Sequence, residues 1–306
     1  MNADLPMISI VTPCLNRSQF IEEAIQSVAQ QNYPHVEHIV VDGGSIDGTL
    51  EILRRYHHLR VISEPDNGLY DALNKAIRLA KGEIIGQLNS DDSYADNIFS
   101  KVARRFVDDP ELDTVCGGAT VFDEDAEGNR ATNAEYQKSH NKELSFYNIT
   151  LGVPIINARF FRRRVYERVG LFDTRYPIVA DRDLLMRMSV AGVKSASLED
   201  VVYHYRRHAD SLSINREGLR VGAMLRECMD MSERYLQRVG LPPEAHRHCR
   251  LWHTRETFRT ALQELFRLRF RDALRYMVLG WHYDAAWSWS LACMAMARVF
   301  SLPRNR

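Results

Sequence analysis

Residues 36–49 read VEHIVVDGGSIDGT, and this stretch decides the fold. Its first half is rich in β-branched residues, which favour a buried strand. The strand ends at Asp42, because the two glycines that follow permit a tight turn. Apolar residues at helical spacing then run from Leu50 to Tyr56. A strand, a turn and a helix in this order form half of a βαβ unit.

The same alternation of strand and helix extends across the first 120 residues. Further strands are predicted at residues 7–11, 61–62, 84–88 and 114–121, and further helices at residues 20–28, 69–80 and 98–106. This pattern predicts a mostly parallel sheet with helices on both faces, an α/β and Rossmann-like architecture. Ligands of such sheets bind at the carboxyl ends of the strands.

Composition sets wide limits on the class of protein. A chain of 306 residues is long enough for about two domains. Hydrophobic residues make up 45% and charged residues 26%, which excludes a disordered or low-complexity protein. Forty basic residues balance forty acidic ones, so the total charge indicates no nucleic-acid partner. From about Gly218 the apolar pattern is helical throughout, which predicts a C-terminal helical extension.

Cysteines and hydrophobic runs bear on the compartment. Five cysteines are scattered without CxxC spacing, which argues against a disulfide framework or a zinc site. Reduced thiols are the simplest interpretation, and they are typical of the cytoplasm. Residues 1–6 show neither the basic nor the apolar part of a signal peptide. No run of about 18 uncharged apolar residues predicts a membrane-spanning helix. We therefore expect a cytoplasmic protein.

Asp42 stands at the end of a predicted strand, where a ligand would bind. Its carboxylate could accept hydrogen bonds from the planar N–H group of a nucleobase. The alternative is a turn followed by a helix capped at Asp47. The stretch lacks both the Gly-x-Gly-x-x-Gly dinucleotide motif and the phosphate-binding loop that ends in Gly-Lys-Ser/Thr. Both of those cofactor classes are therefore disfavoured.

Residues 89–92, NSDD, follow another apolar strand. Two adjacent carboxylates repel each other unless a cation or a hydrogen-bonding ligand neutralises them. Oxygen ligands suit Mg²⁺ or Mn²⁺, which take one or two carboxylates together with phosphate oxygens. The alternative is a solvated acidic entry to the helix that is predicted from Ile98.

Two later segments could also contribute to catalysis. Residues 180–187, ADRDLLMR, place a carboxylate at a helix start, where it could act as a general base or simply cap the helix. Residues 205–213, YRRHADSLS, place two guanidiniums and an imidazole in a predicted loop. These groups could bind a diphosphate or its metal, or they could form an exposed basic loop.

Taken in series, these motifs resemble the family 2 glycosyltransferases, which have the GT-A fold. The resemblance covers roughly residues 7–213, in the family's order. The matching stretches are SIVTP at 9–13 with Asn16, DGGSIDGT at 42–49, SEPDNGLYDALNKA at 63–76, GEIIGQLNSDD at 82–92, GLFD at 170–173, ADRDL at 180–184 and YRRH at 205–208.

The resemblance implies an inverting transferase that uses a nucleotide-sugar donor, with a UDP-sugar favoured, and Mn²⁺ or Mg²⁺. It further implies a glycan or lipid-linked acceptor, in the synthesis of a bacterial surface polysaccharide or glycolipid. Residues 1–215 would form the GT-A catalytic domain, with a nucleotide-sugar half at about 1–122 and an acceptor half at about 123–215. Residues 216–306 would form the helical, basic and aromatic-rich extension.

The resemblance also assigns roles to single residues. Asp181 would be the catalytic base, with Asp183 in reserve, and Asp92 would hold the metal together with Asp91. Thr12 and Pro13 would line the base pocket, Asp42 would bind the base, Asp91 would contact the ribose and diphosphate, and Lys75 and His208 would face the diphosphate. The remaining predicted donor-site residues are Asn16, Gly44, Asp66, Asn67, Gly68, Asp71, Asn89 and Ser90.

Three positions depart from the family pattern. Asn89 stands where many members have Asp, which leaves the metal motif one carboxylate short. Ala180 stands where many members have Glu. Asn157 ends a PIIN stretch where a close subgroup has Pro-x-x-His, so that subgroup's acceptor should not be copied. Two alternatives to a glycosyltransferase remain open: a nucleotidyltransferase, and a non-catalytic partner that only binds a sugar nucleotide.

The C-terminal region is basic. Residues 222–306 contain fourteen Arg, no Lys and eight acidic residues, a net charge of 14 − 8 = +6. Over residues 262–306 the arginines are interleaved with Leu, Phe and Trp. This pattern suits a helix that lies on an anionic membrane surface. Such a helix would attach the protein peripherally to the inner face of the cell membrane. A helical subdomain packed on the core and an interface of an oligomer are the other two interpretations.

Overall fold

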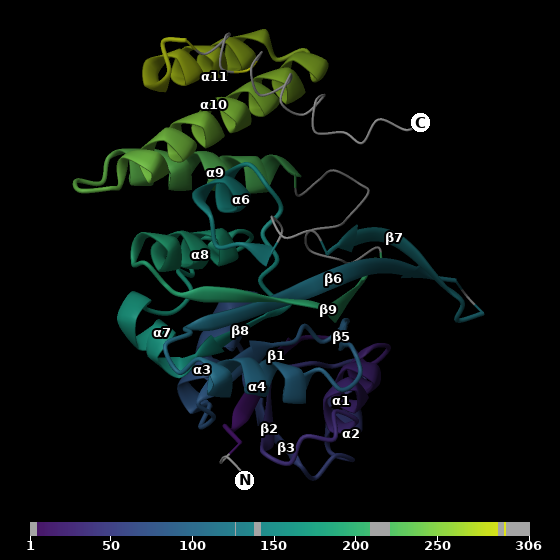
Figure 1. Ribbon diagram of the computed structural model, residues 1–306. Coiled ribbons are helices and arrows are strands. Elements are labelled where there is room, and N and C mark those ends of the chain that lie inside the picture. Colours follow the sequence, from purple (N-terminus) through teal and green to yellow (C-terminus); the bar gives the residue numbers. More distant parts are fainter. Residues whose placement is uncertain (1–4, 126, 138–141, 209–220, 287–290, 292–306) are drawn as a thin grey trace, which may run out of the picture. The chain divides into compact units, whose positions relative to one another are not determined.

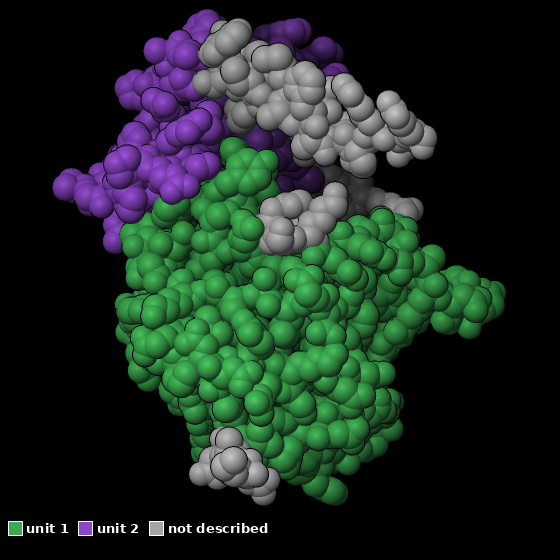
Figure 2. Space-filling model, viewed as in Figure 1, with its two compact units in different colours: residues 1–214 green, residues 215–306 purple. Residues whose placement is uncertain are grey.

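A computed structural model describes residues 5–125, 127–137, 142–208, 221–286 and 291 of the chain (Figure 1). The chain divides into two compact units, residues 1–214 and 215–306 (Figure 2). The first unit contains a β-sheet with helices, and the described part of the second unit is helical.

The sheet of the first unit has nine strands among the described residues, in the order β3-β2-β1-β4-β8-β6-β9-β5, and β7 pairs with β6. The strands are β1 (Ile8–Cys14), β2 (Val36–Asp42), β3 (Leu59–Ser63), β4 (Ile84–Gln87), β5 (Ser93–Tyr94), β6 (Thr114–Glu124), β7 (Arg130–Tyr136), β8 (Arg159–Arg162) and β9 (Ser195–Arg206).

The α/β class with a sheet flanked by helices is confirmed, and the direction of the strands differs between its two halves. Strands β3, β2, β1 and β4 are all parallel, as the sequence predicts. Beyond β4 the sheet is mixed, because β8 lies antiparallel between β4 and β6. Strand β9 then returns parallel to β6. The carboxyl ends of β1, β2, β4 and β9 consequently lie along one edge of the sheet.

Helices cover this sheet where the predicted apolar periodicity places them. On α3, the residues Leu73, Ala76 and Ile77 are buried at helical spacing, and Gly68 begins the helix with a left-handed φ of 103°. The helices of the first unit are α1 (Ile21–Ala29), α2 (Thr49–Leu53), α3 (Leu69–Leu79), α4 (Phe99–Asp108), α6 (Phe146–Thr150), α7 (Arg163–Val169) and α8 (Ala180–Val190).

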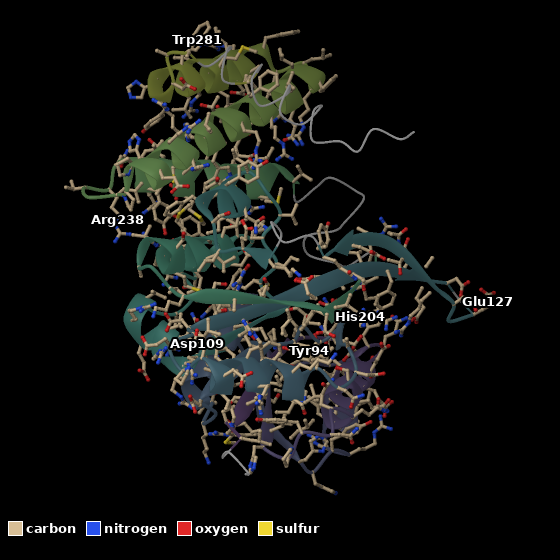
Figure 3. All side chains as sticks on the ribbon, viewed as in Figure 1. Tyr94, Asp109, Glu127, His204, Arg238 and Trp281 are labelled. Atoms are coloured by element: carbon tan, nitrogen blue, oxygen red, sulfur yellow. The ribbon has the colours of Figure 1, made fainter. Side chains whose placement is uncertain are left out.

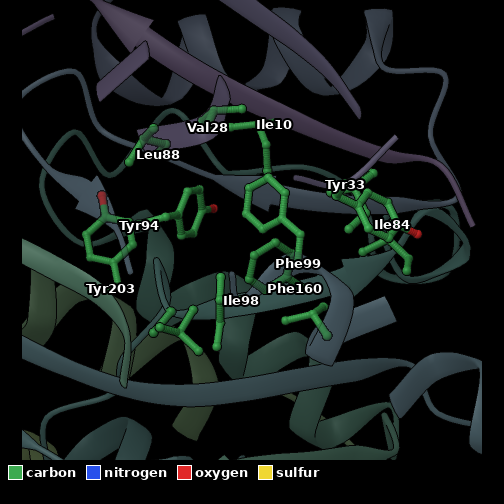
Figure 4. Close-up of a cluster of buried hydrophobic side chains, with 14 of the residues drawn as sticks. Ile10, Val28, Tyr33, Ile84, Leu88, Tyr94, Ile98, Phe99, Phe160 and Tyr203 are labelled. Carbon is green, nitrogen blue, oxygen red and sulfur yellow. The ribbon is translucent and has the colours of Figure 1, made fainter. Parts of the chain in front are cut away.

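Aromatic side chains join the two halves of the sheet in a buried cluster (Figure 4). The ring of Tyr94 lies 5.2 Å from Phe99, 5.5 Å from Phe160 and 5.5 Å from Tyr203, measured between centroids. The Tyr94 hydroxyl donates a hydrogen bond to the carbonyl oxygen of Gln87. This cluster fixes the segment between β4 and β5, which carries the NSDD motif.

The second unit contains three described helices, α9 (Val221–Leu236), α10 (Pro243–Phe266) and α11 (Phe270–Tyr283). Helix α10 packs against both α9 and α11. Its fully buried residues include Trp252 as well as polar side chains such as His253. Among the described residues, no helix has both the length and the apolar character needed to span a bilayer.

Candidate active site

The predicted donor-site residues cluster where β1, β2 and β4 end. Asp42 is fully buried at the last position of β2. Its Oδ2 accepts hydrogen bonds from the backbone N–H groups of Gly44 and Ser45, each at 3.1 Å, and from the Ser63 hydroxyl at 2.7 Å. The Ser45 hydroxyl donates to Oδ1. The carboxylate therefore organises the turn after β2, and its oxygens already bind donors of the protein itself.

The loop after β1 is bonded to the turn after β2. Asn16 has a left-handed φ of 53°, its backbone N–H donates to Ser45 Oγ at 2.7 Å, and its Oδ1 accepts from the N–H of Ile46 at 2.9 Å. Asp47 accepts from the N–H groups of Ser18 and Thr49, at 3.0 and 3.1 Å. Asp47 therefore caps α2 and also joins the two loops into one rigid rim.

Thr12 and Pro13 are the fifth and sixth residues of β1. Both are buried within β1, and the Thr12 hydroxyl lies 2.9 Å from Nε2 of His38 on the neighbouring strand. That these two residues contact a base stays a prediction.

The predicted residues 66–75 form the start of α3. Asp66 Oδ1 accepts from Gly68 N at 2.8 Å, and a Cβ atom on Gly43 would come within 2.6 Å of Asp66 Oδ2. The glycine therefore lets this segment approach the turn after β2. Asp71, in the first turn of α3, accepts through Oδ2 from Asn67 N at 3.0 Å, which ties the preceding segment to the helix.

Lys75 does not present an uncommitted charge to a diphosphate. Its Nζ lies 3.0 Å from a Glu64 carboxylate oxygen and 3.6 Å from one of Asp71, and it donates to the Pro65 carbonyl at 3.1 Å. These contacts raise the pKa of Lys75, with the Glu64 hydrogen bond as the largest cause. That Lys75 faces a diphosphate stays a prediction.

The two adjacent carboxylates after β4 have different environments. Asp92 is 5% exposed, and its Oδ2 accepts from the Tyr203 hydroxyl at 2.8 Å and from Asn89 Nδ2 at 3.0 Å. Its Oδ1 accepts from the backbone N–H of Arg206 at 2.8 Å. Burial, followed by the charge of Asp91, raises the pKa of Asp92 to about 8. A nearby cation would offset this cost of ionisation.

Asp91 is the more exposed member of the pair. Its Oδ2 lies 2.9 Å from Nε2 of His208 and 3.6 Å from Nε of Arg17, and 17% of its side chain is exposed. His208 was predicted at this site, whereas Arg17 was not. Among the described residues no group of three or more His, Cys, Asp or Glu could hold a metal ion. Two carboxylates with diphosphate oxygens are a common set for Mn²⁺ or Mg²⁺, so these residues fit such an ion.

The two predicted guanidiniums occupy a different setting from the one expected. Arg206 is the last residue of β9 and is buried, with ion pairs to Glu23 and to Glu124, the latter at 2.6 Å. Arg207 pairs with Asp123. Arg206 therefore ends a strand instead of lying in the predicted loop, and Arg207 follows it, partly buried beside Asp123. Arg206 instead holds the turn after β4, through its backbone bond to Asp92.

The predicted base and its reserve occupy different sides of α8. Asp181 is half-buried in the first turn, and its Oδ1 accepts from Arg182 N at 2.8 Å. Burial raises the pKa of Asp181, and the Arg182 charge and a Tyr70 hydrogen bond oppose that shift. Asp183 is buried and accepts from Arg187 Nε at 2.7 Å. Arg187 also donates to the carbonyl of Leu171 at 2.6 Å, so this pair ties α8 to the end of α7.

Tyrosines that sequence reasoning missed connect the two acidic regions. Tyr203 bonds to Asp92, and it accepts from the backbone N–H of Asn89 at 3.0 Å. The charges of both Asp92 and Asp181 raise the pKa of Tyr205, after burial as the main cause, so Tyr205 lies within electrostatic reach of both carboxylates. The alternation of strand β9 was the one available signal, because it places Tyr203 and Tyr205 on the same face.

Carboxylates lie at the ends of the parallel strands of this mixed α/β sheet, and another lies at a nearby helix start. This arrangement defines the class of protein as a transferase that uses a sugar nucleotide. The model of glycosyl transferase family 2 matches residues 9–170, which is more than half of the chain. The protein belongs to this family and is a glycosyltransferase. The two alternatives, a nucleotidyltransferase and a non-catalytic binding partner, are therefore set aside.

Curated relatives are similar over part of the chain. The hyaluronan synthase of Pasteurella multocida is 26% identical over 219 residues, which are 70% of this chain and 22% of the relative. A PGL/p-HBAD biosynthesis glycosyltransferase of Mycobacterium bovis is 29% identical over 188 residues, 60% of this chain and 69% of the relative. The match thus spans only about a fifth of the length of the larger synthase.

Solved structures share the fold. The S. aureus TarS 1-349 structure in complex with UDP-GlcNAc gives a TM-score of 0.61 at 20% identity, covering 83% of this chain and 72% of that one. A mannosyltransferase from Pyrobaculum calidifontis in complex with GDP-Man and Mn²⁺ gives 0.57 at 19% identity, covering 98% and 81%.

Proposed function

We propose that this glycosyltransferase inverts the anomeric configuration of its donor, a UDP-sugar, and that Asp181 is the base. The observation that carries the proposal is that Tyr205 on β9 lies within electrostatic reach of both Asp92, the neighbour of Asp91, and Asp181. One carboxylate serves the leaving diphosphate and the other serves the acceptor hydroxyl. Attack from the opposite side needs no covalent intermediate, and so no nucleophilic carboxylate.

The donor would bind along the rim formed by the loops after β1 and β2. Asp42 orients the N–H groups of Gly44 and Ser45 in this rim. Asn16 fixes the rim through its bonds to Ser45 and Ile46. We propose that the rim recognises the nucleoside and that Asp42 acts mainly by holding it in shape.

A divalent ion, Mn²⁺ or Mg²⁺, would be held by Asp91, with Asp92 behind it and His208 beside it. What favours Asp91 over Asp92 is that Asp92 already accepts three hydrogen bonds from the protein. When bound, the ion would neutralise the charge that develops on the diphosphate. Arg17, 3.6 Å from Asp91, supplies a second positive charge at the same place.

Asp181 is suited to take the proton of the acceptor hydroxyl. Burial raises its pKa toward the working pH, which is the condition for an efficient general base. Its position in the first turn of α8 is fixed, because the neighbouring Arg182 donates to the carbonyls of Ile149 and Gly152, the latter at 3.5 Å. Those contacts also bring α6 and the loop that follows it next to the base.

We propose a glycan or lipid-linked acceptor and a role in bacterial surface polysaccharide or glycolipid synthesis. The support is that the curated relatives include a hyaluronan synthase and a PGL/p-HBAD biosynthesis glycosyltransferase. We also propose that the enzyme works in the cytoplasm, attached peripherally to the inner face of the membrane through residues 262–306.

A donor screen tests the proposal. UDP-glucose, UDP-galactose, UDP-GlcNAc, UDP-glucuronate and GDP-mannose are incubated with the full-length protein, with Mn²⁺ or with chelator, and the release of nucleoside diphosphate is measured. We expect release from a UDP-sugar only when the metal is present. NMR of the glycoside product should show an inverted anomeric carbon.

Two variants make the screen specific. Asp91→Asn should lose the metal-dependent release, whereas Glu127→Gln, which changes an exposed carboxylate in the β6–β7 turn, should behave as wild type. Undiminished release in chelator, or a product that retains the donor configuration, would contradict the proposal.

A further inference from the structure

Exposed apolar side chains are concentrated in one short part of the second unit. Six of the thirteen exposed large hydrophobic residues among those described lie between residues 266 and 281. Phe266 is 86% exposed and Leu268 is 75% exposed, in the connection between α10 and α11. Water-soluble monomers rarely expose contiguous apolar patches of this kind unless the patch binds something.

The patch continues along one side of α11. Phe270, Leu274 and Val278 follow one another at intervals of four residues, and all three are more than half exposed. Residues at this spacing lie on the same side of a helix. Ala273 and Gly280 are buried on another side, where α11 packs against α10. Trp281 projects from α11 on the side away from α10 (Figure 3).

Arginines border this apolar stripe. Arg271 and Arg275 each come one residue after a member of the stripe, are exposed, and have no ion pair among the described residues. Arg267 and Arg269 lie in the preceding turn and share Glu264, at 3.1 and 3.5 Å. Asp272 is the only acidic residue within α11 itself. Around the stripe, four arginines therefore outnumber two carboxylates.

We infer that this surface, the stripe of Phe266, Leu268, Phe270, Leu274 and Val278 with its border of Arg271 and Arg275, docks on an anionic phospholipid bilayer. The inference deepens the proposed function, on which it rests for its setting, by naming the contact and the lipid charge. The apolar side chains enter the headgroup–acyl boundary and the guanidiniums bind lipid phosphates.

Charge complementarity selects lipid over a second copy of the chain. A two-fold contact through the stripe would bring its arginine border against the same border of the other copy. Like charges at short range oppose such a dimer. An anionic leaflet instead attracts basic residues near its surface and accepts aromatic side chains at its interface.

Vesicle binding by the full-length protein tests the inference. Sedimentation is measured with phosphatidylcholine vesicles and with vesicles that contain one quarter phosphatidylglycerol, at low and high salt. We expect binding to the anionic vesicles only, and weaker binding at high salt. R271Q/R275Q should lower the affinity by about 30-fold, because each basic residue near an anionic surface contributes about fivefold. F270S/L274S should lower it by at least about tenfold.

Matched controls change equally exposed groups elsewhere in the second unit. V239S removes an exposed apolar side chain, R247Q removes an exposed arginine, and both should bind vesicles as wild type does. Circular dichroism checks that each variant keeps its helices. Failure of the wild type to bind anionic vesicles at low salt would overturn the inference. Binding of both double variants with the affinity of the wild type would also overturn it.

Two further measurements separate the alternatives. Sedimentation velocity at the vesicle-assay concentration should give a monomer, and a dimer that F270S/L274S dissociates would overturn the inference. Asp181→Asn should bind vesicles normally while failing to transfer sugar. If vesicle binding fails and metal-dependent donor release persists, the membrane inference and the proposed membrane attachment fall, and the proposed transfer reaction stands. If donor release fails and vesicle binding persists, only the proposed function falls.

Discussion

The turn after β4 and the first turn of α8 each carry two carboxylates, and in each region the two members have different surroundings. Asp92 is enclosed by three protein donors, and Asp183 is buried against Arg187. Asp91 and Asp181 lie beside them and are less buried. Each region thus pairs a carboxylate that supports the structure with one that can meet a ligand.

The comparison shows what a sequence motif leaves undecided. The motifs NSDD and ADRD identify both pairs of carboxylates. They do not show which member of each pair is buried, because this depends on the direction of each side chain. In α8 the two residues point away from each other because positions i and i+2 lie on different sides of a helix. After β4 the difference arises from a distant strand, since β9 supplies two of the three donors to Asp92.

The largest effect is expected at the start of α8. Asp181→Asn keeps the size of the side chain but cannot accept a proton, so turnover should fall by about 10²- to 10⁴-fold while donor affinity survives. Single-turnover transfer and titration with the nucleoside diphosphate measure the two quantities separately.

The matched variant in this region is Asp183→Asn. It should retain turnover within about tenfold and lose about 1–3 kcal/mol of stability, because Arg187 loses a charged partner. Normal turnover in Asp181→Asn together with an inactive, stable Asp183→Asn would reverse the assignment of the base.

The next effect concerns the turn after β4. Asp91→Asn should weaken Mn²⁺-dependent donor binding by more than the 10- to 100-fold that loss of an outer partner typically costs. Asp92→Asn places an amide against the backbone N–H of Arg206, so it should mainly lower the melting temperature. Isothermal titration with and without Mn²⁺ and a thermal melt of both variants measure this. Full metal dependence in Asp91→Asn would show that the ion is held elsewhere.

Local patterns were sufficient for the parallel half of the sheet. The β-branched run at residues 36–41 and the glycines after Asp42 give the strand, the turn and the following helix without any distant information. The position of β8 between β4 and β6 was beyond such reasoning, because strand pairing depends on contacts between residues far apart in sequence. The prediction that Arg206 lies in a loop was wrong for the same reason, since strand β9 extends to this residue and ion pairs to Glu23 and Glu124 set its environment.

The pH dependence of kcat/KM is a further test of Asp181 as the base, with a smaller expected effect than the substitutions above. Because burial raises the pKa of Asp181, the free enzyme should lose kcat/KM as the pH falls through a value above the ordinary range of a carboxyl group. Below that value activity should drop about tenfold per pH unit. Asp183→Asn should leave this acid limb in place, and Asp181→Asn should abolish it. An acid limb that stays in Asp181→Asn would assign it to another group.

The smallest effect tests burial itself, the cause that separates the members of both pairs, at a residue remote from catalysis. His38 is buried in β2 against Thr12, and burial lowers its pKa to about 3. The unfolded chain binds a proton at His38 below pH 6.5 and the folded chain does not. The free energy of unfolding should therefore decrease as the pH falls from 6.5 toward 3, by up to about 1.4 kcal/mol per pH unit from this residue.

His38→Gln keeps a hydrogen-bonding group beside Thr12 but cannot titrate. Urea unfolding at pH 7, 6 and 5 should show a smaller acid-induced loss of stability in this variant than in the wild type, whatever its stability at pH 7. His57→Gln, at an exposed histidine, should keep the wild-type dependence. If His38→Gln also keeps the full wild-type dependence, the acid-induced loss of stability does not arise from burial of His38.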